Sequence, residues 1–273
     1  MQTIIPAIWF DQDAGEAFGY YAGIFPSGTI SKSSPVVTEA TLMGVRFIGI
    51  NGGPLYKPNP AISFMVICGD RQELDAIWNA LSERGVALMP LDSYPWSPYY
   101  GWIQDKYGVS WQLYLGNAQD TNGQRIVPTL MYCGPQQGNC LSAMDHYQSL
   151  FRDYKSQGVL LYAEGDMKGQ VQHTQFIANG FTLMAMDSGV PQPFTFTEGI
   201  SLTILCTDQQ EIDYYWDKIT RNGSAGMCGW CKDTYGVSWQ IVPANMEQYM
   251  QSPAAAKALM QMKKIIIKDL EQA

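Results

Sequence analysis

Histidine is scarce in this chain of 273 residues, which contains only His146 and His173. That scarcity restricts metal coordination and acid–base chemistry that use imidazole side chains. Charged residues make up only 15% of the chain, and 17 Lys and Arg stand against 25 Asp and Glu. A net charge of −8 without a basic cluster is a poor match for phosphate groups. We therefore expect neither a nucleic acid nor a membrane surface as a partner.

Long apolar runs are missing as well. None approaches the ~18 residues that a membrane-spanning helix needs, and the first residues carry Asp11 and Asp13 rather than the basic group of an export signal. These absences predict a cytoplasmic protein, whose six cysteines are expected to be free thiols in a reducing compartment. Hydrophobic residues, at 46%, are sufficient for a packed core.

The chain repeats itself. The segment 101–113 returns at 229–241 with nine of 13 positions identical, and 62–85 returns at 200–223 with nine of 24 identical. The two offsets, 128 and 138, differ because the first half carries ten extra residues around Met89–Tyr100. We predict that this Pro- and Tyr-rich stretch is a loop that covers a pocket or makes a subunit contact.

Each half shows two successions of a strand, a helix and further strands. Short apolar runs at 4–10 and 62–68 predict strands, and helical spacing follows each of them, at 14–25 and 72–84. Ser252 and Pro253 favour the start of a final helix with an apolar stripe through Leu270. The expected domains are therefore 1–118 and 125–246, followed by a C-terminal helix at 250–273.

These features resemble the vicinal oxygen chelate superfamily, which includes glyoxalase, and more closely its PhnB-like branch, with the label 3-demethylubiquinone-9 3-methyltransferase domain. The residues that carry the resemblance are Pro6–Phe10, Asn51–Pro54, Cys206–Glu211, Cys228–Trp230 and the Gly-Val-Ser-Trp-Gln motif at 108–112 and 236–240. The resemblance implies an α+β fold of two tandem glyoxalase-like domains, each built from two βαβββ units, plus the C-terminal helix.

Metal-using members of the superfamily place His, Glu or Gln ligands on the first and last strands of each unit. The corresponding residues here are Ala7, Asn51, Ser63 and Gln112 in the first half, and Thr129, Asp187, Ser201 and Gln240 in the second. Only the two glutamines and, less well, Asp187 could coordinate a metal, and a divalent cation needs about four donors. We therefore predict no metal and no cofactor.

A cup without metal could still bind a small molecule. Adjacent strand residues face opposite sides, so if the tryptophans of the Trp-Gln pairs pack beneath the helices, Gln112 and Gln240 face the inside of the sheet. They would then form a polar floor, or simply be buried glutamines bonded to neighbours. Three further tryptophans either line the cup or fill the core: Trp9, Trp102 and Trp230.

Reactive side chains offer few alternatives. Cys228 is the candidate nucleophile, although Cys228 and Cys231 are more simply read as two unpaired thiols. Asp105 and Asp233 precede tight turns and are expected to cap them. Cys68 and Cys206 are expected in the core, and His146 on a solvent-facing helix surface. His173, on a predicted strand, is expected to be a rim residue rather than a catalyst.

Two functions remain open. The first is a metal-free protein that binds a small organic molecule. The second is a superfamily enzyme: a metal-dependent lyase or dioxygenase, one that uses Cys228, or the methyltransferase of the family label. The chain has no Gly-x-Gly-x-x-Gly turn for an adenosyl cofactor. With both domains in one chain, the expected state is a monomer that forms the pair internally, or a homodimer.

Overall fold

The computed structural model describes residues 2–273, and it contains four units of the same kind. The first holds β1 (Ile4–Phe10), α1 (Ala14–Ile24), β2 (Thr29–Ser33), β3 (Val37–Leu42) and β4 (Val45–Asn51). The second holds β5 (Ile62–Cys68), α2 (Arg71–Ser82), β6 (Val86–Tyr94), β7 (Ser97–Gln104) and β8 (Ser110–Leu115). The third holds β9 (Ile126–Tyr132), α3 (Cys140–Leu150), β10 (Lys155–Leu161), β11 (Val171–Ala178) and β12 (Phe181–Asp187). The fourth holds β13 (Ile200–Cys206), α4 (Gln209–Thr220), β14 (Ser224–Ala225), β15 (Trp230–Lys232) and β16 (Ser238–Pro243).

The four units form two eight-stranded sheets, and each sheet joins the two halves of the chain. Sheet A has the order β14-β15-β16-β13-β1-β4-β3-β2, and sheet B the order β10-β11-β12-β9-β5-β8-β7-β6. The seams are antiparallel, between β1 and β13 in sheet A and between β5 and β9 in sheet B. The predicted α+β fold of βαβββ units is confirmed, with first and fourth units sharing one sheet and the two central units the other.

The units of one half meet on their helix-covered faces instead. Trp111, on β8 of the second unit, packs with ring centroids 5.2 Å from Tyr21 and 4.7 Å from Phe25 of α1 in the first unit. Trp239 packs in the same way at 5.8 Å from Tyr147 of α3. Both tryptophans are 0% exposed, so each half has its own aromatic core behind the sheets.

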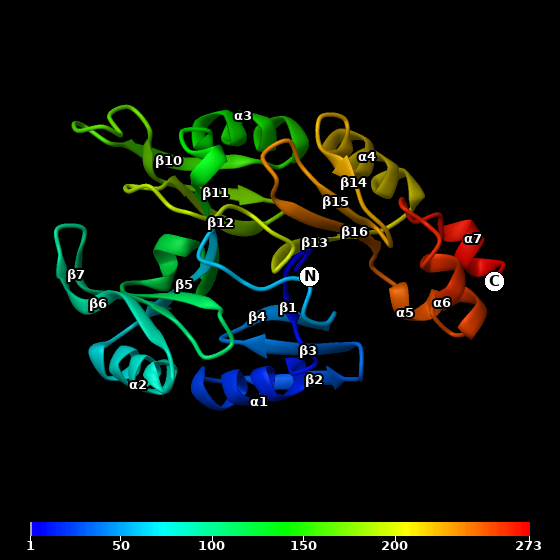
Figure 1. Ribbon diagram of the computed structural model, residues 1–273, viewed down its shortest axis with the longest axis horizontal. Coiled ribbons are helices and arrows are strands. Elements are labelled where there is room, and N and C mark those ends of the chain that lie inside the picture. Colours follow the sequence, from blue (N-terminus) through cyan, green and yellow to red (C-terminus); the bar gives the residue numbers. More distant parts are fainter. Residues whose placement is uncertain (1) are drawn as a thin grey trace.

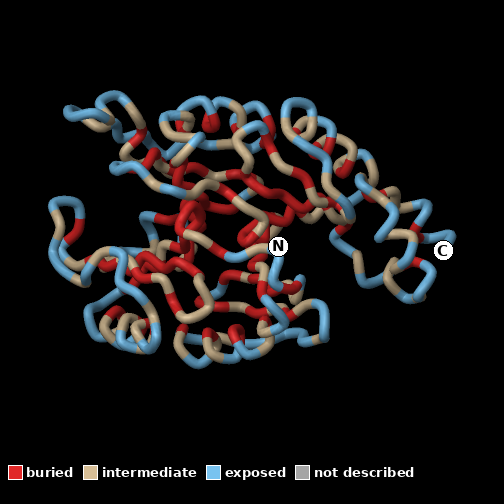
Figure 2. The backbone as a smooth tube through the Cα atoms, in the orientation of Figure 1, coloured by how far each residue is buried: buried red, intermediate tan, exposed pale blue. Residues whose placement is uncertain are grey.

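The sheets curve, with the helices outside and an inner face left free of them (Figure 1). We call these inner faces cup A and cup B, after their sheets. Buried backbone follows the central strands, whereas the hairpins that carry β6–β7 and β10 are largely exposed (Figure 2). The core therefore lies along the central strands, away from these sheet edges.

Two short edge strands were not expected from the sequence. β2 and β10 pair on one side only, and every residue in both strands is exposed. Because neither strand is buried on either face, neither shows the apolar alternation by which strands are found in a sequence.

The stretch Met89–Tyr100 is a β-hairpin rather than the predicted loop. β6 and β7 pair antiparallel through three register shifts, and β6 is the edge strand of sheet B. An edge strand with bulges tolerates proline because one row of N–H groups needs no partner. Pro90 therefore lies in a strand, although a proline in a sequence usually indicates a turn or a loop.

The C-terminal segment forms short helices instead of one long helix: α5 (Met246–Tyr249), α6 (Pro253–Leu259) and α7 (Ile267–Glu271). The predicted start is confirmed, because Ser252 Oγ accepts a hydrogen bond from Ala255 N. The helix stops because the chain after α6 pairs with the fourth unit: the carbonyls of Met262 and Lys263 accept hydrogen bonds from Cys228 N and Gly229 N.

Candidate functional site in the two sheet cups

Three predicted ligand-binding residues meet in cup A, although they come from both ends of the chain. Trp230 on β15 lies directly opposite Gln240 on β16, and cross-strand partners share a face. Trp9 on β1 lies 5.8 Å from Trp230, ring centroid to ring centroid, in an edge-to-face arrangement. The antiparallel β1–β13 seam brings these aromatic rings together.

The polar floor of cup A consists of Gln240 and its neighbours on β13. Gln240 Nε2 donates to Ser201 Oγ at 2.9 Å. Thr203 is next to Gln240 in the parallel register of β13 and β16, and its buried hydroxyl has no hydrogen-bond partner in residues 2–273. Over the same described range, Gln240 Oε1 also accepts no hydrogen bond. A buried floor with two unused polar atoms can accept a ligand group.

Cup B contains the matching residues in a closed arrangement. Gln112 Nε2 donates to Ser63 Oγ at 2.7 Å, as its counterpart does in cup A. Here, however, Tyr100 OH donates to Gln112 Oε1 at 2.7 Å, so the amide is bonded at both ends. Trp102 lies opposite Gln112, and its indole N–H donates to Ser110 Oγ at 3.1 Å. The sequence pattern predicted Tyr100 in a loop that covers a pocket or makes a subunit contact, whereas it lies in β7 and bonds Gln112.

The residues aligned with metal ligands do not form a divalent-metal site. Asn51 Oδ1 accepts from Ala14 N at the start of α1, and its Nδ2 donates to Pro35 O. Asp187 accepts three backbone N–H bonds, from Gly138, Cys140 and Val171. Both side chains therefore serve the helix side of the sheet. No group of three or more His, Cys, Asp or Glu in the described chain could hold a metal.

The helix N-termini are occupied as well. Asp70 and Asp208 cap α2 and α4 through Glu73 N and Glu211 N, while Asn51 and Asp187 bond the first turns of α1 and α3. The N–H groups that bind anionic cofactors at helix starts are thus engaged by the chain itself. The starts of α1 to α4 are therefore already hydrogen-bonded within the described chain.

Cys228 lies outside cup A. It precedes β15 with φ of 57°, and its Sγ is 3.7 Å from Met260 Sδ in the C-terminal segment. Burial raises the pKa of the Cys228 thiol, which is the opposite of what an activated thiolate requires. Cys231 is buried and its pKa is also raised by burial. All six cysteines are free, and the predicted core positions of Cys68 and Cys206 are confirmed.

The predicted turn-capping role of Asp105 and Asp233 is confirmed. Asp105 Oδ1 accepts from Tyr107 N and Val109 N within its turn, at 2.9 and 3.0 Å. Its second oxygen accepts from Tyr21 OH and Trp111 Nε1, at 2.6 and 2.8 Å. Burial raises the pKa of this carboxyl, and these four hydrogen bonds oppose the rise. Asp105 therefore joins two units of one half rather than working in either cup.

The histidines do not join the cup A floor. His146 on α3 is half-buried rather than solvent-facing, and its buried Nε2 has no partner in the described chain. Its ring lies 6.0 Å from that of Tyr235. His173 is on β11 of sheet B, whereas Gln240 is on β16 of sheet A. Burial lowers the pKa of both imidazoles.

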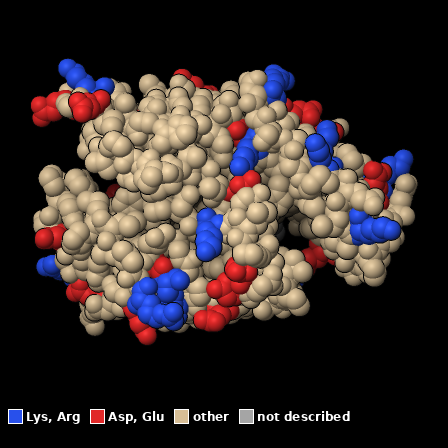
Figure 3. All heavy atoms as spheres, viewed as in Figure 1, with Lys and Arg blue, Asp and Glu red and all other residues tan. Residues whose placement is uncertain are grey.

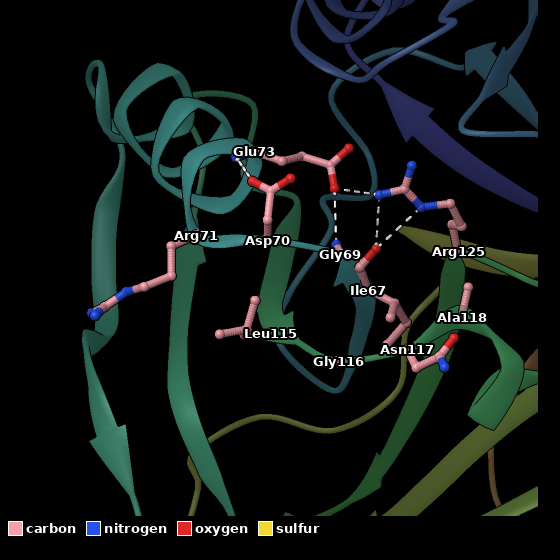
Figure 4. Close-up of a pocket in the computed structure, with 10 residues that line it drawn as sticks. All are labelled: Ile67, Gly69, Asp70, Arg71, Glu73, Leu115, Gly116, Asn117, Ala118 and Arg125. Carbon is pink, nitrogen blue, oxygen red and sulfur yellow. Dashed lines mark hydrogen bonds and ion pairs between the residues drawn. The ribbon is translucent and has the colours of Figure 1, made fainter.

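One further hollow lies away from the cups, at the start of α2. This groove, of about 820 Å³, is open and contains an ion pair between Arg125 and Glu73 (Figure 4). The Arg125 guanidinium also donates to Ile67 O, and the Glu73 carboxylate also accepts from Gly69 N. The Arg125 and Glu73 charges are thus paired with each other, while the remaining cation of the lining, Arg71, stacks on the Tyr99 ring at 3.8 Å.

The surface agrees with a weakly charged protein. Lys and Arg alternate with Asp and Glu, and broad areas of the visible face carry no charge (Figure 3). None of the helices in residues 2–273 has the length and apolar character needed to cross a membrane.

Comparison with known proteins agrees with the geometry. A family model described as 3-demethylubiquinone-9 3-methyltransferase matches twice, at residues 2–114 and 124–242. The PhnB protein of Bacillus cereus is 34% identical over 42% of this chain and 100% of its own, with a TM-score of 0.39. A Zea mays glyoxalase I mutant shares the fold, with a TM-score of 0.56 at 9% identity over 92% of this chain and 97% of its own. Among curated proteins there is no match.

The two family matches coincide with the two pseudo-repeats, and each spans a pair of βαβββ units. Together they cover most of the chain, in a fold shared with glyoxalase I. This protein belongs to the PhnB-like, 3-demethylubiquinone-9 3-methyltransferase family.

Proposed function

We propose that this protein binds a small organic molecule in cup A without a metal ion. The observation that carries the proposal is the difference between two equivalent glutamines. Gln112 Oε1 accepts a hydrogen bond from Tyr100, whereas Gln240 Oε1 accepts none within residues 2–273. A ligand O–H or N–H could donate to this oxygen, and burying both partners would make such a bond worth about 1 kcal/mol or more.

The surroundings of Gln240 fit such a ligand. Trp9 and Trp230 are both half-buried and present apolar rings beside the amide. The nearby Lys232 pairs with Glu198 at 2.9 Å, so it brings no uncompensated charge. An apolar wall with one or two placed polar atoms is typical of small-molecule sites. The ligand class that this arrangement favours is neutral and partly aromatic.

The C-terminal segment could retain such a ligand. It extends from β16, forms an ion pair between Glu247 of α5 and Lys32 of β2, and returns to the backbone of Cys228 and Gly229. The segment therefore contacts β2 at one edge of sheet A and the residues that precede β15 near the other edge.

The proposal is tested by thermal shift with a library of neutral aromatic fragments. We expect fragments that raise the melting temperature of the wild-type protein but not of Gln240→Met, which keeps the side-chain length and removes the acceptor. Gln112→Met is the matched control and should retain the shift. If no fragment stabilises the protein, or if the shift survives Gln240→Met and is lost in Gln112→Met, cup A is not the site.

The alternative is enzymatic activity, either through a metal or as the methyl transfer that the family description names. Equilibrium dialysis against Zn²⁺, Ni²⁺ and Mn²⁺ separates the metal-dependent form of this alternative from the proposal. Ala7, Ser201 and Gln240 supply too few donors for these ions, so we expect no stoichiometric binding. One tightly bound ion per chain would favour the enzyme. We further propose a cytoplasmic location, which the six free thiols support.

A further inference from the structure

Tyr100 fills in cup B the place that a ligand would take in cup A. Its ring is 5% exposed, and its hydroxyl donates to Gln112 Oε1 at 2.7 Å. Gln112 in turn donates to Ser63 Oγ. The phenol of this tyrosine is thus bound by the same Gln–Ser pair that recurs in cup A as Gln240 and Ser201.

The internal repeat identifies what cup A has in place of this phenol. With the offset of 128 residues, Trp102 corresponds to Trp230, Gln112 to Gln240, and Tyr100 to Cys228. Cys228 does not replace the phenol, because its backbone is left-handed and its Sγ contacts Met260. Cup A therefore keeps the indole and the acceptor, but no group in residues 2–273 donates a hydrogen bond to Gln240 Oε1.

We propose that the ligand of cup A is a phenol, whose hydroxyl donates to Gln240 Oε1 as Tyr100 donates to Gln112. This inference rests on the function proposed above. The phenol ring would lie beside Trp230 and Trp9, where aromatic contacts add about 0.5–1.5 kcal/mol beyond burial.

The protonated phenol is the form that this site selects. Gln240 Oε1 can only accept a hydrogen bond, so a phenolate would leave two acceptors facing each other. Thr203 Oγ1, buried beside Gln240 and without a partner in the described chain, offers a second group for an ortho substituent. Lys232 is paired with Glu198 and does not supply a cation for a phenolate.

The test uses p-cresol and toluene, which differ only in the hydroxyl group, in isothermal titration calorimetry of the full-length protein. We expect p-cresol to bind at least about tenfold more tightly than toluene, since a hydrogen bond of about 1.4 kcal/mol corresponds to that factor. In Gln240→Met the preference for p-cresol should disappear. Circular dichroism verifies that this variant is folded.

A second variant provides an internal standard. Tyr100→Ala removes a buried phenol from cup B, and p-cresol should bind there and raise the melting temperature of the variant, as ligands do when they fill a cavity. The wild-type protein should then show one p-cresol site, and Tyr100→Ala two. One site in the wild type that is lost in Gln240→Met supports the inference.

The outcomes distinguish a failure of the phenol inference from a failure of the proposed binding function. If neutral aromatic fragments bind in a Gln240-dependent way but p-cresol shows no advantage over toluene, the phenol inference is wrong and the binding function stands. If p-cresol binds only to Tyr100→Ala, the phenol inference is also wrong, because cup A then does not accept the group that cup B holds. If neither p-cresol nor any aromatic fragment binds the wild type, the binding function itself is refuted.

Discussion

At the scale of single residues, the two buried aspartates have the largest structural role. Asp233 accepts from Tyr147 OH at 2.8 Å and Trp239 Nε1 at 3.0 Å, and from two backbone N–H groups of its own turn. Asp105 repeats these contacts in the first half. One carboxylate thus fixes a turn, a strand and the helix of a neighbouring unit.

We predict that Asp233→Asn lowers the free energy of unfolding by about 2–4 kcal/mol. An amide NH₂ group only donates hydrogen bonds, so it would face the donors that the carboxylate oxygen now accepts from. Asp105→Asn should have a similar effect. Urea unfolding measures both, with the exposed Asp166→Asn as a control that should change the unfolding free energy by less than about 0.5 kcal/mol. Equal effects of all three substitutions would contradict the assigned role.

His146 makes the halves unequal at a second residue. Its counterpart in the first half is Tyr20, because each of the two residues lies four residues before the end of its helix, Ile24 in α1 and Leu150 in α3. Lys106 Nζ lies 4.1 Å from the centroid of the Tyr20 ring. Burial lowers the pKa of His146, whose Nε2 lacks a partner in the described chain. The folded state therefore prefers the neutral imidazole, and stability is complete above the unfolded pKa of about 6.5 and declines as the pH falls below it.

We expect His146→Tyr to reduce the loss of stability between pH 7.5 and 5.5, by up to about 1 kcal/mol. The buried Asp233 has a raised pKa and contributes in the opposite direction, since protonation of such a carboxyl favours the folded state. Because Asp233 is present in both proteins, the difference in unfolding free energy reports mainly on the histidine. Identical pH profiles would show that His146 is not the titrating group.

At the scale of elements, the C-terminal segment is held by a short backbone contact at Gly229. This glycine has φ of 84°, and an added Cβ would lie 2.7 Å from Ile241 O and 3.0 Å from Ile265 Cδ1. Its N–H bonds Lys263 O, and Ile265 is fully buried. The segment therefore depends on a residue that lies outside it.

Gly229→Ala should lower the free energy of unfolding by about 2–4 kcal/mol and increase protease cleavage after residue 243. The left-handed backbone strains an alanine, and the overlap of its Cβ with Ile241 O adds to this strain. Gly236→Ala is the matched control: its φ is 87°, but nothing lies within 4 Å of an added Cβ. This control should cost only about 1–2 kcal/mol from the left-handed conformation. Equal losses, with the C-terminal segment still protected, would argue against the contact.

The elements also show what the sequence could reveal. Helices and strands with a buried side were predictable, because burial imposes an apolar period, as in α2 with Leu74, Ile77 and Leu81. The exposed β2 and β10 have no such period. The β6–β7 hairpin was predicted to be a loop because it contains Pro90, on the edge strand β6, and two further prolines, Pro95 and Pro98. Strand alternation predicted that Gln112 and Gln240 face the inner side if Trp111 and Trp239 face the helices, but it left Trp9, Trp102 and Trp230 open between cup and core. The positions of Tyr100 and Thr203 depend on strand register.

At the scale of the whole molecule, the halves share both sheets. β1 and β5 belong to the first half, and their seam partners β13 and β9 belong to the second. The sequence predicted the tandem repeat, but a repeat alone does not show which copies pair. Trp9 and Gln240 could therefore not be placed in one cup from the sequence.

An isolated fragment of residues 1–118 would leave one edge of the apolar strands β1 and β5 without its seam partner, since β13 and β9 lie outside it. Every residue of β5 except Met65 is buried in the whole chain. We predict that this fragment forms a homodimer with two rebuilt seams, or aggregates. Light scattering after size exclusion distinguishes these states. A folded monomer at micromolar concentration would mean that the seams contribute little to stability.

The antiparallel β1–β13 seam also sets an order of events during synthesis. Sheet B comprises strands from residues 62–187 without interruption, so it can close while nearly a third of the chain is still being made. Strand β1 emerges first, yet its seam partner at 200–206 comes almost two hundred residues later. The first strand made must therefore remain without that partner through most of translation, and cup A is the last part of the protein to exist.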